Sequence, residues 1–144
     1  MTQEMKQYTG TRTIKAMPIT INKAYKRKFL KEGVKPSECE TYKAGYLVEY
    51  EEGYQSWCPA ETFEQAYKPS ETALDRLRIE YSELRERFRT LFDEYTNIGF
   101  DKLIEKVGVN QAALLGVQHM LMKNYLEVLE SRIADMEANE NKQQ

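Results

Sequence analysis

The sequence has little of what metalloproteins, secreted proteins and most enzymes depend on. Its 144 residues include two cysteines, Cys39 and Cys58, and a single histidine, His119. Two cysteines are too few for a disulfide framework, and with one histidine they make a poor set of zinc ligands. The seven glycines are scattered along the chain, so the sequence contains no glycine-rich loop that could cradle a phosphate. We therefore expect neither a metal nor a cofactor.

A catalytic constellation and a membrane-directed segment are missing as well. The spacing around His119 offers it no serine or cysteine nucleophile, and we interpret this histidine as a half-exposed packing residue within a helix. No apolar run approaches the roughly 18 residues that a membrane span requires. The opening residues, "MTQEMKQYTG", lack the apolar core of a signal peptide. These features predict a cytoplasmic binding protein that contacts no membrane and is not an enzyme.

The charges are divided unevenly along the chain. Residues 1–37 contain nine Lys or Arg against two Glu, a net +7, whereas the remainder contains twelve against twenty-one acids, a net −9. The basic part includes "KAYKRKFLK", residues 23–31. Such a segment attracts anions, nucleotides or acidic protein surfaces, although a solvated helix face also accounts for it. Because the whole chain carries −2, we expect no nucleic-acid partner.

The residue patterns predict an α+β fold that begins with a small, antiparallel β-rich module at residues 8–68. The segment "TRTIKAMPITI" suits a strand that ends at Pro18, and "INKAYKRKFL" suits a short basic helix. The segments "GYLVEY", "EEG" and "YQSWC" read as a β-hairpin. Pro59 then fits the first position of a short helix, which places Phe63 and Tyr67 four residues apart on one face.

A long antiparallel hairpin of two helices is predicted to follow, at residues 70–137. Ser70 or Thr72 provides the N-cap of its first helix, and Asn110 that of its second. The helices are expected at about 72–97 and 111–137, with a disordered tail at 138–144. The first helix carries an apolar heptad seam, a pattern typical of coiled-coil contacts. The members of this seam are Leu74, Leu77, Tyr81, Leu84, Phe88, Leu91, Tyr95 and Ile98.

The second helix of the hairpin has more apolar surface than one partner helix can cover. One predicted stripe holds Leu115, Met122, Tyr125, Leu129 and Met136, and a second holds Leu114, Val117, Leu121 and Val128. An exposed apolar surface of this size is costly in a monomer. We therefore predict that the chain oligomerises through its helices. The alternative is that the N-terminal module covers the second stripe.

Aromatic and arginine side chains supply the candidate binding sites. A nucleotide-like ligand needs a flat surface for its base and fixed cations for its phosphates. One candidate site combines aromatics of the first module with arginines of the first long helix: Tyr54, Trp57, Phe63, Tyr67, Arg76, Arg78 and Arg85. A second, for cyclic nucleotides between helices, uses Arg87, Lys123 and Arg132. The plainer alternative is that the aromatics form a core and that the arginines lie on a solvated helix surface.

The helical half resembles a hairpin shared by two families of phage anti-defence proteins. These are the first-described Thoeris anti-defence family and the second-described anti-CBASS family, and the matching segments are "RLRIEYSELRERF" and "LLGVQHMLMKNYLEVLESRI". The N-terminal half, with "GYLVEYEEGYQSWCPAETFEQAY", is similar to a small module common in phage proteins. A β-rich module followed by the hairpin looks more like the Thoeris type.

This resemblance implies a phage sponge that acts in the cytosol of the host cell. Members of these families bind bacterial immune signalling nucleotides and sequester them without degrading them. The implied ligand is a glyco-cyclic ADP-ribose, with cyclic di- and trinucleotides as further ligands, and the implied assembly is a dimer or a hexamer. The alternative is a phage interaction or assembly protein, built on a helical oligomer, that takes no small-molecule ligand.

Overall fold

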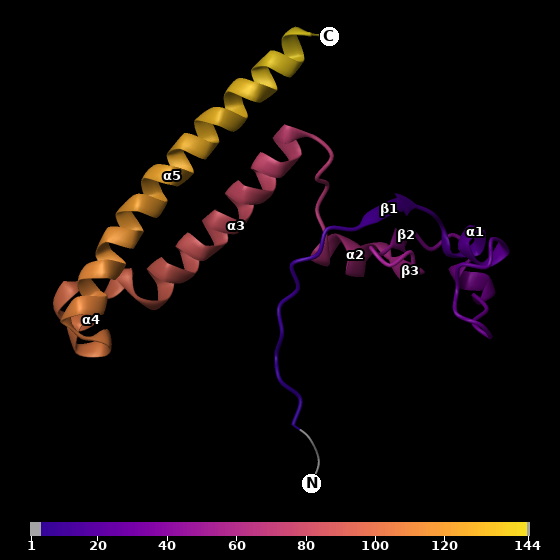
Figure 1. The fold of residues 1–144 in the computed structure, drawn as a ribbon, viewed down its shortest axis with the longest axis horizontal. Helices are drawn as coiled ribbons and strands as arrows, with labels where there is room; N and C mark the ends of the chain where they lie inside the picture. Colours follow the sequence, from indigo (N-terminus) through magenta and orange to yellow (C-terminus); the bar gives the residue numbers. More distant parts are fainter. Residues whose placement is uncertain (1–3, 144) are drawn as a thin grey trace. The chain divides into compact units, whose positions relative to one another are not determined.

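A computed structural model describes residues 4–143 of the chain and divides it into two compact units, Met1–Lys68 and Pro69–Gln144. The first unit holds a small antiparallel sheet with short helices, and the second is almost wholly helical (Figure 1). The predicted α+β class is therefore confirmed. Within residues 4–143, none of the helices has the length and hydrophobicity that crossing a membrane requires.

The sheet of the first unit has three antiparallel strands in the order β1-β2-β3. They are β1 at Lys15–Pro18, β2 at Gly45–Glu49 and β3 at Gln55–Pro59. The predicted hairpin is confirmed, since Leu47 pairs with Trp57 across β2 and β3. Proline cannot donate to a strand ladder, and Pro18 accordingly closes an edge strand, opposite Tyr46.

Short helical segments accompany this sheet. They are α1 at Ile21–Lys26, a 3-10 turn at Glu38–Glu40 and α2 at Ala60–Ala66. Of these, α2 packs against β2 and β3. Thr20 caps α1 through its side chain, so the predicted basic helix is confirmed, although it ends before Arg27. Pro59 does not occupy the first helical position; it ends β3 and takes the N-cap position of α2. This shift by one residue follows from the pairing of Pro59 with Gly45, which keeps it in the sheet.

The core of the first unit occupies both faces of the sheet. On one face Ile19, Ala24 and Leu47 are buried, and Phe29, Leu30 and Trp57 pack against them. Val48, which is 1% exposed, follows Leu47 on β2 and therefore points to the other face. Trp57 lies so close over Gly45 that a Cβ at that position would be 2.3 Å from the indole ring. The hairpin strand therefore needs glycine at position 45 because the tryptophan occupies the space of a side chain.

The second unit consists of four helical segments. They are α3 at Ala73–Glu94, a 3-10 turn at Thr96–Ile98, α4 at Phe100–Val107 and α5 at Val109–Lys142. Thr72 caps α3 and forms a capping box with Asp75, which confirms one of the two predicted caps. Gly99 and Gly108 have φ values of +84° and +88°, a region that favours glycine, and they separate α4 from its neighbours.

Both boundaries of the last helix differ from the prediction, and the first long helix ends at Glu94 where about 97 was expected. Asn110 does not cap the last helix, because Gly108 already takes the N-cap position and α5 begins at Val109. The tail expected at 138–144 continues as helix as far as Lys142. The residues after Glu137 include no glycine or proline that would stop a helix, and Glu137 itself is held to α3 by an ion pair with Arg78.

The two long helices pack side by side (Figure 1). On α3 the predicted seam is confirmed: Leu74, Leu77 and Leu91 are buried and its other members are half-buried. On α5 the inward seam differs in part from the predicted one. It follows 3-4 spacing through Ala112, Leu115, His119, Met122, Leu126, Leu129, Ile133 and Met136, all buried or half-buried. Tyr125, which was predicted in this seam, is 44% exposed instead.

Candidate functional site

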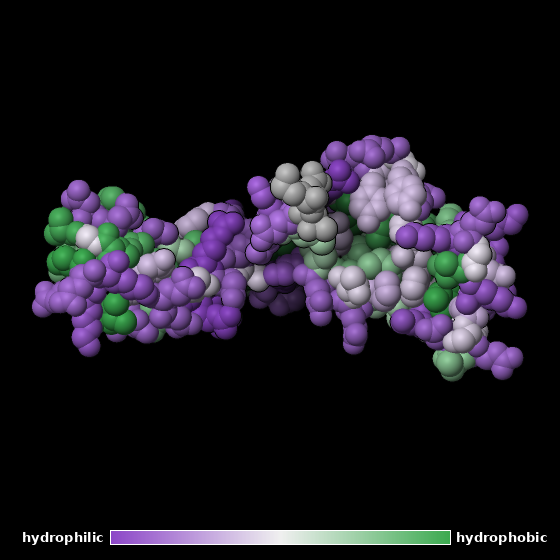
Figure 2. Space-filling model, turned by 90° about the horizontal axis from the view of Figure 1, so that it is seen from below, coloured by the Kyte–Doolittle hydropathy of each residue, from purple (hydrophilic) through white to green (hydrophobic). Residues whose placement is uncertain are grey.

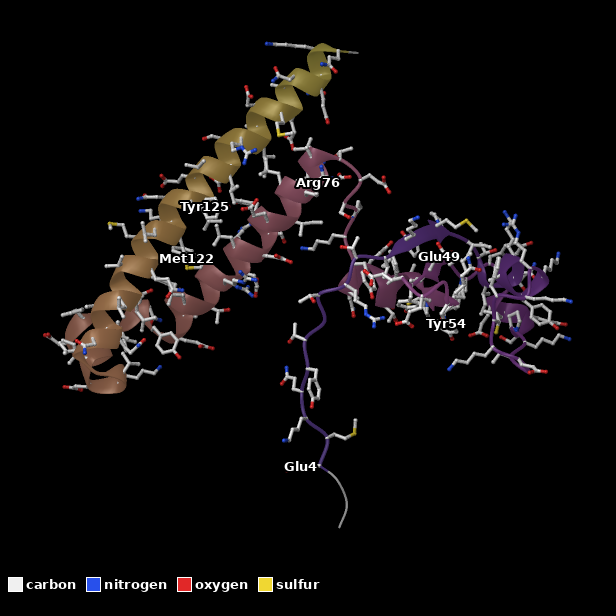
Figure 3. The ribbon with its side chains drawn as sticks, viewed as in Figure 1. Glu4, Glu49, Tyr54, Arg76, Met122 and Tyr125 are labelled. Carbon is white, nitrogen blue, oxygen red and sulfur yellow. The ribbon has the colours of Figure 1, made fainter. Side chains whose placement is uncertain are left out.

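The flanks of the α3–α5 contact are closed by polar pairs. The Tyr81 hydroxyl donates to Glu130 Oε1 at 2.6 Å, and Arg78 Nη2 donates to Glu137 Oε1 at 3.0 Å. The Tyr125 hydroxyl donates to Glu80, which explains why this residue lies beside the seam and not in it; Figure 3 labels it on α5, where that helix runs along α3. The hydrogen bond to Glu130 is the main cause that raises the pKa of Tyr81.

The three arginines predicted at the first site have different local partners. Arg76 Nη1 donates to the carbonyl oxygens of Ser70 and Glu71 at 3.4 and 3.3 Å. Arg78 makes ion pairs with Glu137 and Asp75. Arg85 is exposed and, among the described residues, takes part in no hydrogen bond or ion pair. Of the three, Arg85 therefore has its guanidinium available without breaking an existing contact.

The cations of the second predicted site are exposed too. Arg87, Lys123 and Arg132 lie on the solvent side of their helices. No hydrogen bond or ion pair engages their side chains within the part of the chain that the structure describes. A guanidinium without a protein partner can donate two parallel hydrogen bonds to a phosphate or carboxylate. Together with Arg85, these side chains contribute available positive charge to the two long helices.

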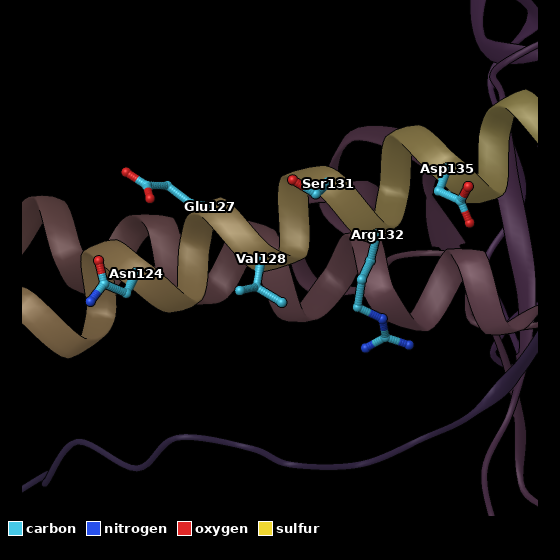
Figure 4. Close-up of a pocket in the computed structure, with 6 residues that line it drawn as sticks. All are labelled: Asn124, Glu127, Val128, Ser131, Arg132 and Asp135. Carbon is cyan, nitrogen blue, oxygen red and sulfur yellow. The ribbon is translucent and has the colours of Figure 1, made fainter.

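An open groove runs along the outer face of α5. Its lining residues come from this one helix and are Asn124, Glu127, Val128, Ser131, Arg132 and Asp135. Figure 4 shows Val128 and Arg132 side by side on one flank of α5, whereas Glu127 points away on the other. Among the predicted site residues, only Arg132 lies in this groove. Because a single helix lines it, the groove has one wall and leaves a bound molecule open to water.

The groove belongs to a longer stripe on the outside of the hairpin. The second predicted apolar stripe is confirmed as a separate surface: Leu114, Val117, Leu121 and Val128 are each about half exposed or more. Green, hydrophobic residues also gather at the left end of the molecule in Figure 2, the end at which Figure 1 places α4 and the start of α5.

Sequence reasoning missed the polar members of this stripe, although the spacing could have revealed them. Residues 114, 117, 121, 124, 128, 131 and 135 follow the same 3-4 spacing as the inner seam. Asn124, Ser131 and Asp135 therefore continue the apolar stripe into the groove. A search limited to apolar residues stops at Val128 and leaves the groove undetected.

The aromatic residues of the first unit form one continuous stack and one separate pair. Tyr46 and Phe63 stack with ring centroids 4.1 Å apart, and Phe63 and Tyr67 follow at 5.3 Å. The Tyr46 hydroxyl donates to Glu64 Oε1 at 3.1 Å, and this hydrogen bond is the main cause that raises the pKa of Tyr46. The predicted pair on α2 is thus extended by a tyrosine of β2.

Trp57 lies apart from that stack. Neighbouring strand residues point to opposite faces of a sheet; Leu47 and Trp57 face the core beside α1, whereas Tyr46 faces α2. The indole Nε1 of Trp57 donates to the carbonyl oxygen of Ile19 at 3.0 Å. The fold therefore uses the polar atom of Trp57 and much of its ring to hold β1, β2 and β3 together.

Tyr54 is the most exposed aromatic of the predicted site. It is 57% exposed and lies just before β3, where Figure 3 labels it. Its ring stacks on Tyr50 at 5.9 Å, and its carbonyl oxygen accepts from the Tyr50 N–H at 2.9 Å. Among the four predicted aromatics, Tyr54 offers the largest free surface to a base.

His119 is built into the hairpin. Its Nδ1 shares a hydrogen bond of 3.0 Å with the Thr96 hydroxyl, and its ring contacts Phe88 at a centroid distance of 4.9 Å. It occupies one position of the inner seam, so its interpretation as a half-exposed packing residue is confirmed. Across residues 4–143, no three His, Cys, Asp or Glu side chains gather as metal ligands would.

Comparison with known proteins finds a family match for the hairpin. The family model described as Sequestin matches residues 71–135, which span α3, α4 and most of α5. This match fits a family of sequestering proteins, as the resemblance of the hairpin implies. No curated protein and no solved structure matches the chain. The first unit, including its aromatic stack, lies outside the matched residues.

Proposed function

We propose that this chain is a sponge that binds bacterial immune signalling nucleotides and holds them intact, in the cytosol of a phage-infected cell. The observation that carries the proposal is the Sequestin match over residues 71–135, whose name describes sequestration. The proposed ligand is a glyco-cyclic ADP-ribose, with cyclic di- and trinucleotides as further ligands. The relation to the Thoeris and anti-CBASS families is part of the same proposal.

The available arginines support an anionic ligand on the hairpin. Arg85, Arg87 and Arg132 are exposed, and no side chain of the described residues engages them in an ion pair. Arginine binds phosphate with a planar fork that an ammonium group lacks. Each proposed ligand carries two or more phosphate groups in a ring, so a rigid helix that presents arginines at fixed positions matches its chemistry.

A second copy of the chain would supply the missing wall of the groove. A tight sponge must compete with a cellular sensor, and nanomolar affinity corresponds to about −12 kcal/mol. Such affinity requires a pocket that covers most of the ligand, whereas the groove beside Arg132 has one wall. Pairing through the outer stripe of Leu114, Val117, Leu121 and Val128 would bury apolar surface and close the groove in one step.

The exposed face of Tyr54 and the stack of Phe63 and Tyr67 support a place for the base. Stacking of a base on an aromatic side chain contributes about 1–3 kcal/mol. Tyr54 is 57% exposed, and its ring stacks on that of Tyr50 with an angle of 24° between the ring planes. We assign Tyr54, Phe63 and Tyr67 a stacking role, and Trp57 a structural one that supports them.

Release after denaturation tests the proposal. The protein is mixed with a glyco-cyclic ADP-ribose, freed of unbound ligand and heated, and the supernatant is analysed by mass spectrometry. We expect the intact nucleotide to be released in proportion to the protein. A cleaved product, or no retention of either ligand class, would contradict sequestration. Titration with both classes then decides between one site and two, since competition between them argues against separate sites.

Matched variants locate the site on the hairpin. Arg132→Ala removes a cation from the groove, whereas Arg89→Ala removes an arginine that is paired with Glu86 on α3. We expect the first change to weaken cyclic nucleotide binding at least tenfold and the second to leave it unchanged. Equal effects of both variants would indicate a general charge effect and not a site at the groove.

A second candidate function is favoured by the outer stripe itself. An uncovered apolar stripe on a long helix also suits an interaction or assembly protein with no small-molecule ligand. Native mass spectrometry separates the two, because it reports the oligomer and its nucleotide occupancy together. An oligomer that stays empty with every candidate nucleotide, but captures a defined phage protein, would support this second function.

A further inference from the structure

The first unit has a basic surface for which nucleotide sequestration by the hairpin has no use. It comprises the cations on and just after α1: Lys23, Lys26, Arg27, Lys28, Lys31 and Lys35. All six are exposed, and Glu32 is the one acid among them. Within the described residues, none of the six side chains takes part in an ion pair or a hydrogen bond. Their charge is therefore uncompensated at the surface.

The fold separates this basic surface from part of the acids of the same unit, although Glu38 and Glu40 follow soon after Lys35, and Glu40 pairs with Lys43 at 4.0 Å. Ile21 and Ala24 of α1 are buried, so the lysines of that helix face outward. The N–H of Ile21 donates to the carbonyl oxygen of Lys43 at 2.9 Å, which holds α1 beside the Gly45 end of β2. The acids Glu49, Glu51 and Glu52 lie at the opposite end, around the hairpin turn. The chain as a whole carries a net charge of −2, but the electrostatic potential beside α1 is locally positive.

Lys28 combines a positive charge with a backbone conformation that suits glycine. Lys28 is the one described non-glycine residue with a positive φ, at 62°. It reverses the chain after α1, so that the Phe29 N–H donates to the Ala24 carbonyl oxygen at 2.9 Å and Phe29 packs on the core. Glycine adopts this conformation without strain. A lysine at this position places a positive charge at the centre of the basic surface.

Exposed tyrosines accompany these cations. Tyr42, which precedes Lys43 beside the start of α1, is 87% exposed, and Tyr25 on α1 itself is 40% exposed. Proteins that bind single strands without sequence preference combine a basic track for the backbone with aromatic rings on which bases stack. We propose that the basic surface binds single-stranded nucleic acid, with the cations on phosphates and Tyr42 and Tyr25 on bases.

This proposal revises the expectation that an acidic chain has no nucleic-acid partner. Residues 1–68 hold eleven Lys or Arg against nine acids, whereas residues 69–144 hold ten against fourteen. The negative total thus comes from the second unit. Single-strand binding and nucleotide sequestration are assigned to different residues, so each activity can fail without the other.

Fluorescence anisotropy of the full chain with a labelled oligothymidylate tests the proposal. Affinity is measured from about 50 to about 200 mM salt. The plot of log K against log salt falls with a slope of about −0.7 per phosphate contact for a single strand, so each lost contact makes the fall less steep by about 0.7. Lys26→Gln with Lys28→Gln is compared with Lys102→Gln with Lys142→Gln, which removes the same charge from exposed sites of the second unit. We expect the first pair of substitutions to make the fall of log K with salt less steep by about 1.4 and the second pair to leave it unchanged.

Tyr42→Ala tests base stacking separately from charge, because this substitution leaves the charge of the protein unchanged. Loss of one stacked base is expected to weaken binding about tenfold, with the salt slope unchanged because no phosphate contact is lost. Lys28→Gly serves as the folding control, since it relieves the backbone and still removes the charge; we expect a higher melting midpoint and weaker binding. The proposal is overturned if the protein does not bind the oligonucleotide at about 50 mM salt, or if both pairs of lysine substitutions weaken binding equally. It is also overturned if the protein is retained on anionic lipid vesicles but not on the oligonucleotide.

Discussion

The two units of this chain build their cores in different ways. The core of the first unit depends on one tryptophan, whose ring fills the space above Gly45 and whose N–H donates to the carbonyl oxygen of Ile19. The second unit repeats a simple seam along two helices and leaves a further stripe on the outside. A core with one central residue tolerates little change, whereas a repeated seam distributes stability over many similar contacts.

This difference indicates which side chains the fold already uses and which remain available to a ligand or a partner. In the first unit, side chains that look suited to a ligand are largely occupied by the fold, and Tyr54 and the stack on α2 retain exposed edges. In the second unit the inner seam is complete without the outer stripe, so Leu114, Leu121 and Val128 contribute little to the single hairpin. Apolar residues that the fold does not need are the best evidence for a partner.

Gly45→Ala gives the largest expected effect, because it places a Cβ 2.3 Å from the Trp57 ring and 2.5 Å from the Cys58 carbonyl oxygen. We expect the first unit to lose about 3 kcal/mol of its free energy of unfolding. Trp57 is the one tryptophan of the chain, so its fluorescence reports this unit, while helical circular dichroism reports the hairpin. Gly10→Ala, with open space around it, is the control. If both signals shift together in Gly45→Ala, the two units unfold as one and the comparison between them fails.

Neighbouring residues on α5 test the inner and outer stripes. Leu129 is fully buried and Val128 is 54% exposed. We expect Leu129→Ala to destabilise the hairpin by about 3 kcal/mol. Val128→Ala is expected to change the unfolding of a dilute sample by less than about 0.5 kcal/mol, but to lower the concentration dependence of its melting midpoint, which reports self-association.

The reverse result would be equally informative. If Val128→Ala destabilises the dilute hairpin as much as Leu129→Ala, another part of the same chain already covers the outer stripe. Sedimentation velocity of the wild type over a range of concentrations decides whether that cover is a second copy. A single species at all concentrations would contradict the proposed pairing.

Much of the fold could be predicted from the sequence because its signals are local. Turn residues marked the β2–β3 hairpin, and the 3-4 spacing of α3 identified its inner seam. The seam of α5 was harder, because Tyr125 is apolar in character but turns aside to Glu80, whereas Ala112 and His119 look unsuited to a core yet lie in it. Spacing, and not residue type, carried the correct signal there.

The candidate site was less predictable, because exposure and partners depend on contacts far apart in the sequence. The sequence does not reveal that the Trp57 indole N–H donates to the carbonyl oxygen of Ile19, or that Arg78 pairs with Glu137. It does not reveal either that Tyr46 extends the aromatic stack of Phe63 and Tyr67. Each of these facts comes from a pairing between residues that the fold alone brings together.

A smaller effect of opposite sign is expected for the strained turn of the first unit. Lys28→Gly relieves a positive φ, a gain of about 1 kcal/mol, but glycine also adds freedom to the unfolded chain. We therefore expect a net stabilisation of about 0.5 kcal/mol, read from Trp57 fluorescence in urea. Arg27→Gly, one residue earlier at a φ of −88°, has no strain to relieve and is expected to destabilise. A loss of stability in Lys28→Gly would mean that this turn is not strained.

The smallest effect is a dependence of the hairpin on alkaline pH. The hydrogen bond to Glu130 raises the pKa of Tyr81 above its ordinary value of about 10. Because the folded state holds this proton more tightly than the unfolded state, the stabilisation is complete below the ordinary pKa and is lost as the pH rises through the raised one. Tyr81→Phe is therefore expected to lower stability at neutral pH and to flatten its fall above about pH 10. Urea unfolding followed by helical circular dichroism measures the stability at both pH values. Tyr42→Phe, which changes an exposed tyrosine of the first unit, is the control. If stability falls identically with alkaline pH in the wild type and in Tyr81→Phe, the Tyr81–Glu130 hydrogen bond contributes nothing to the stability of the hairpin.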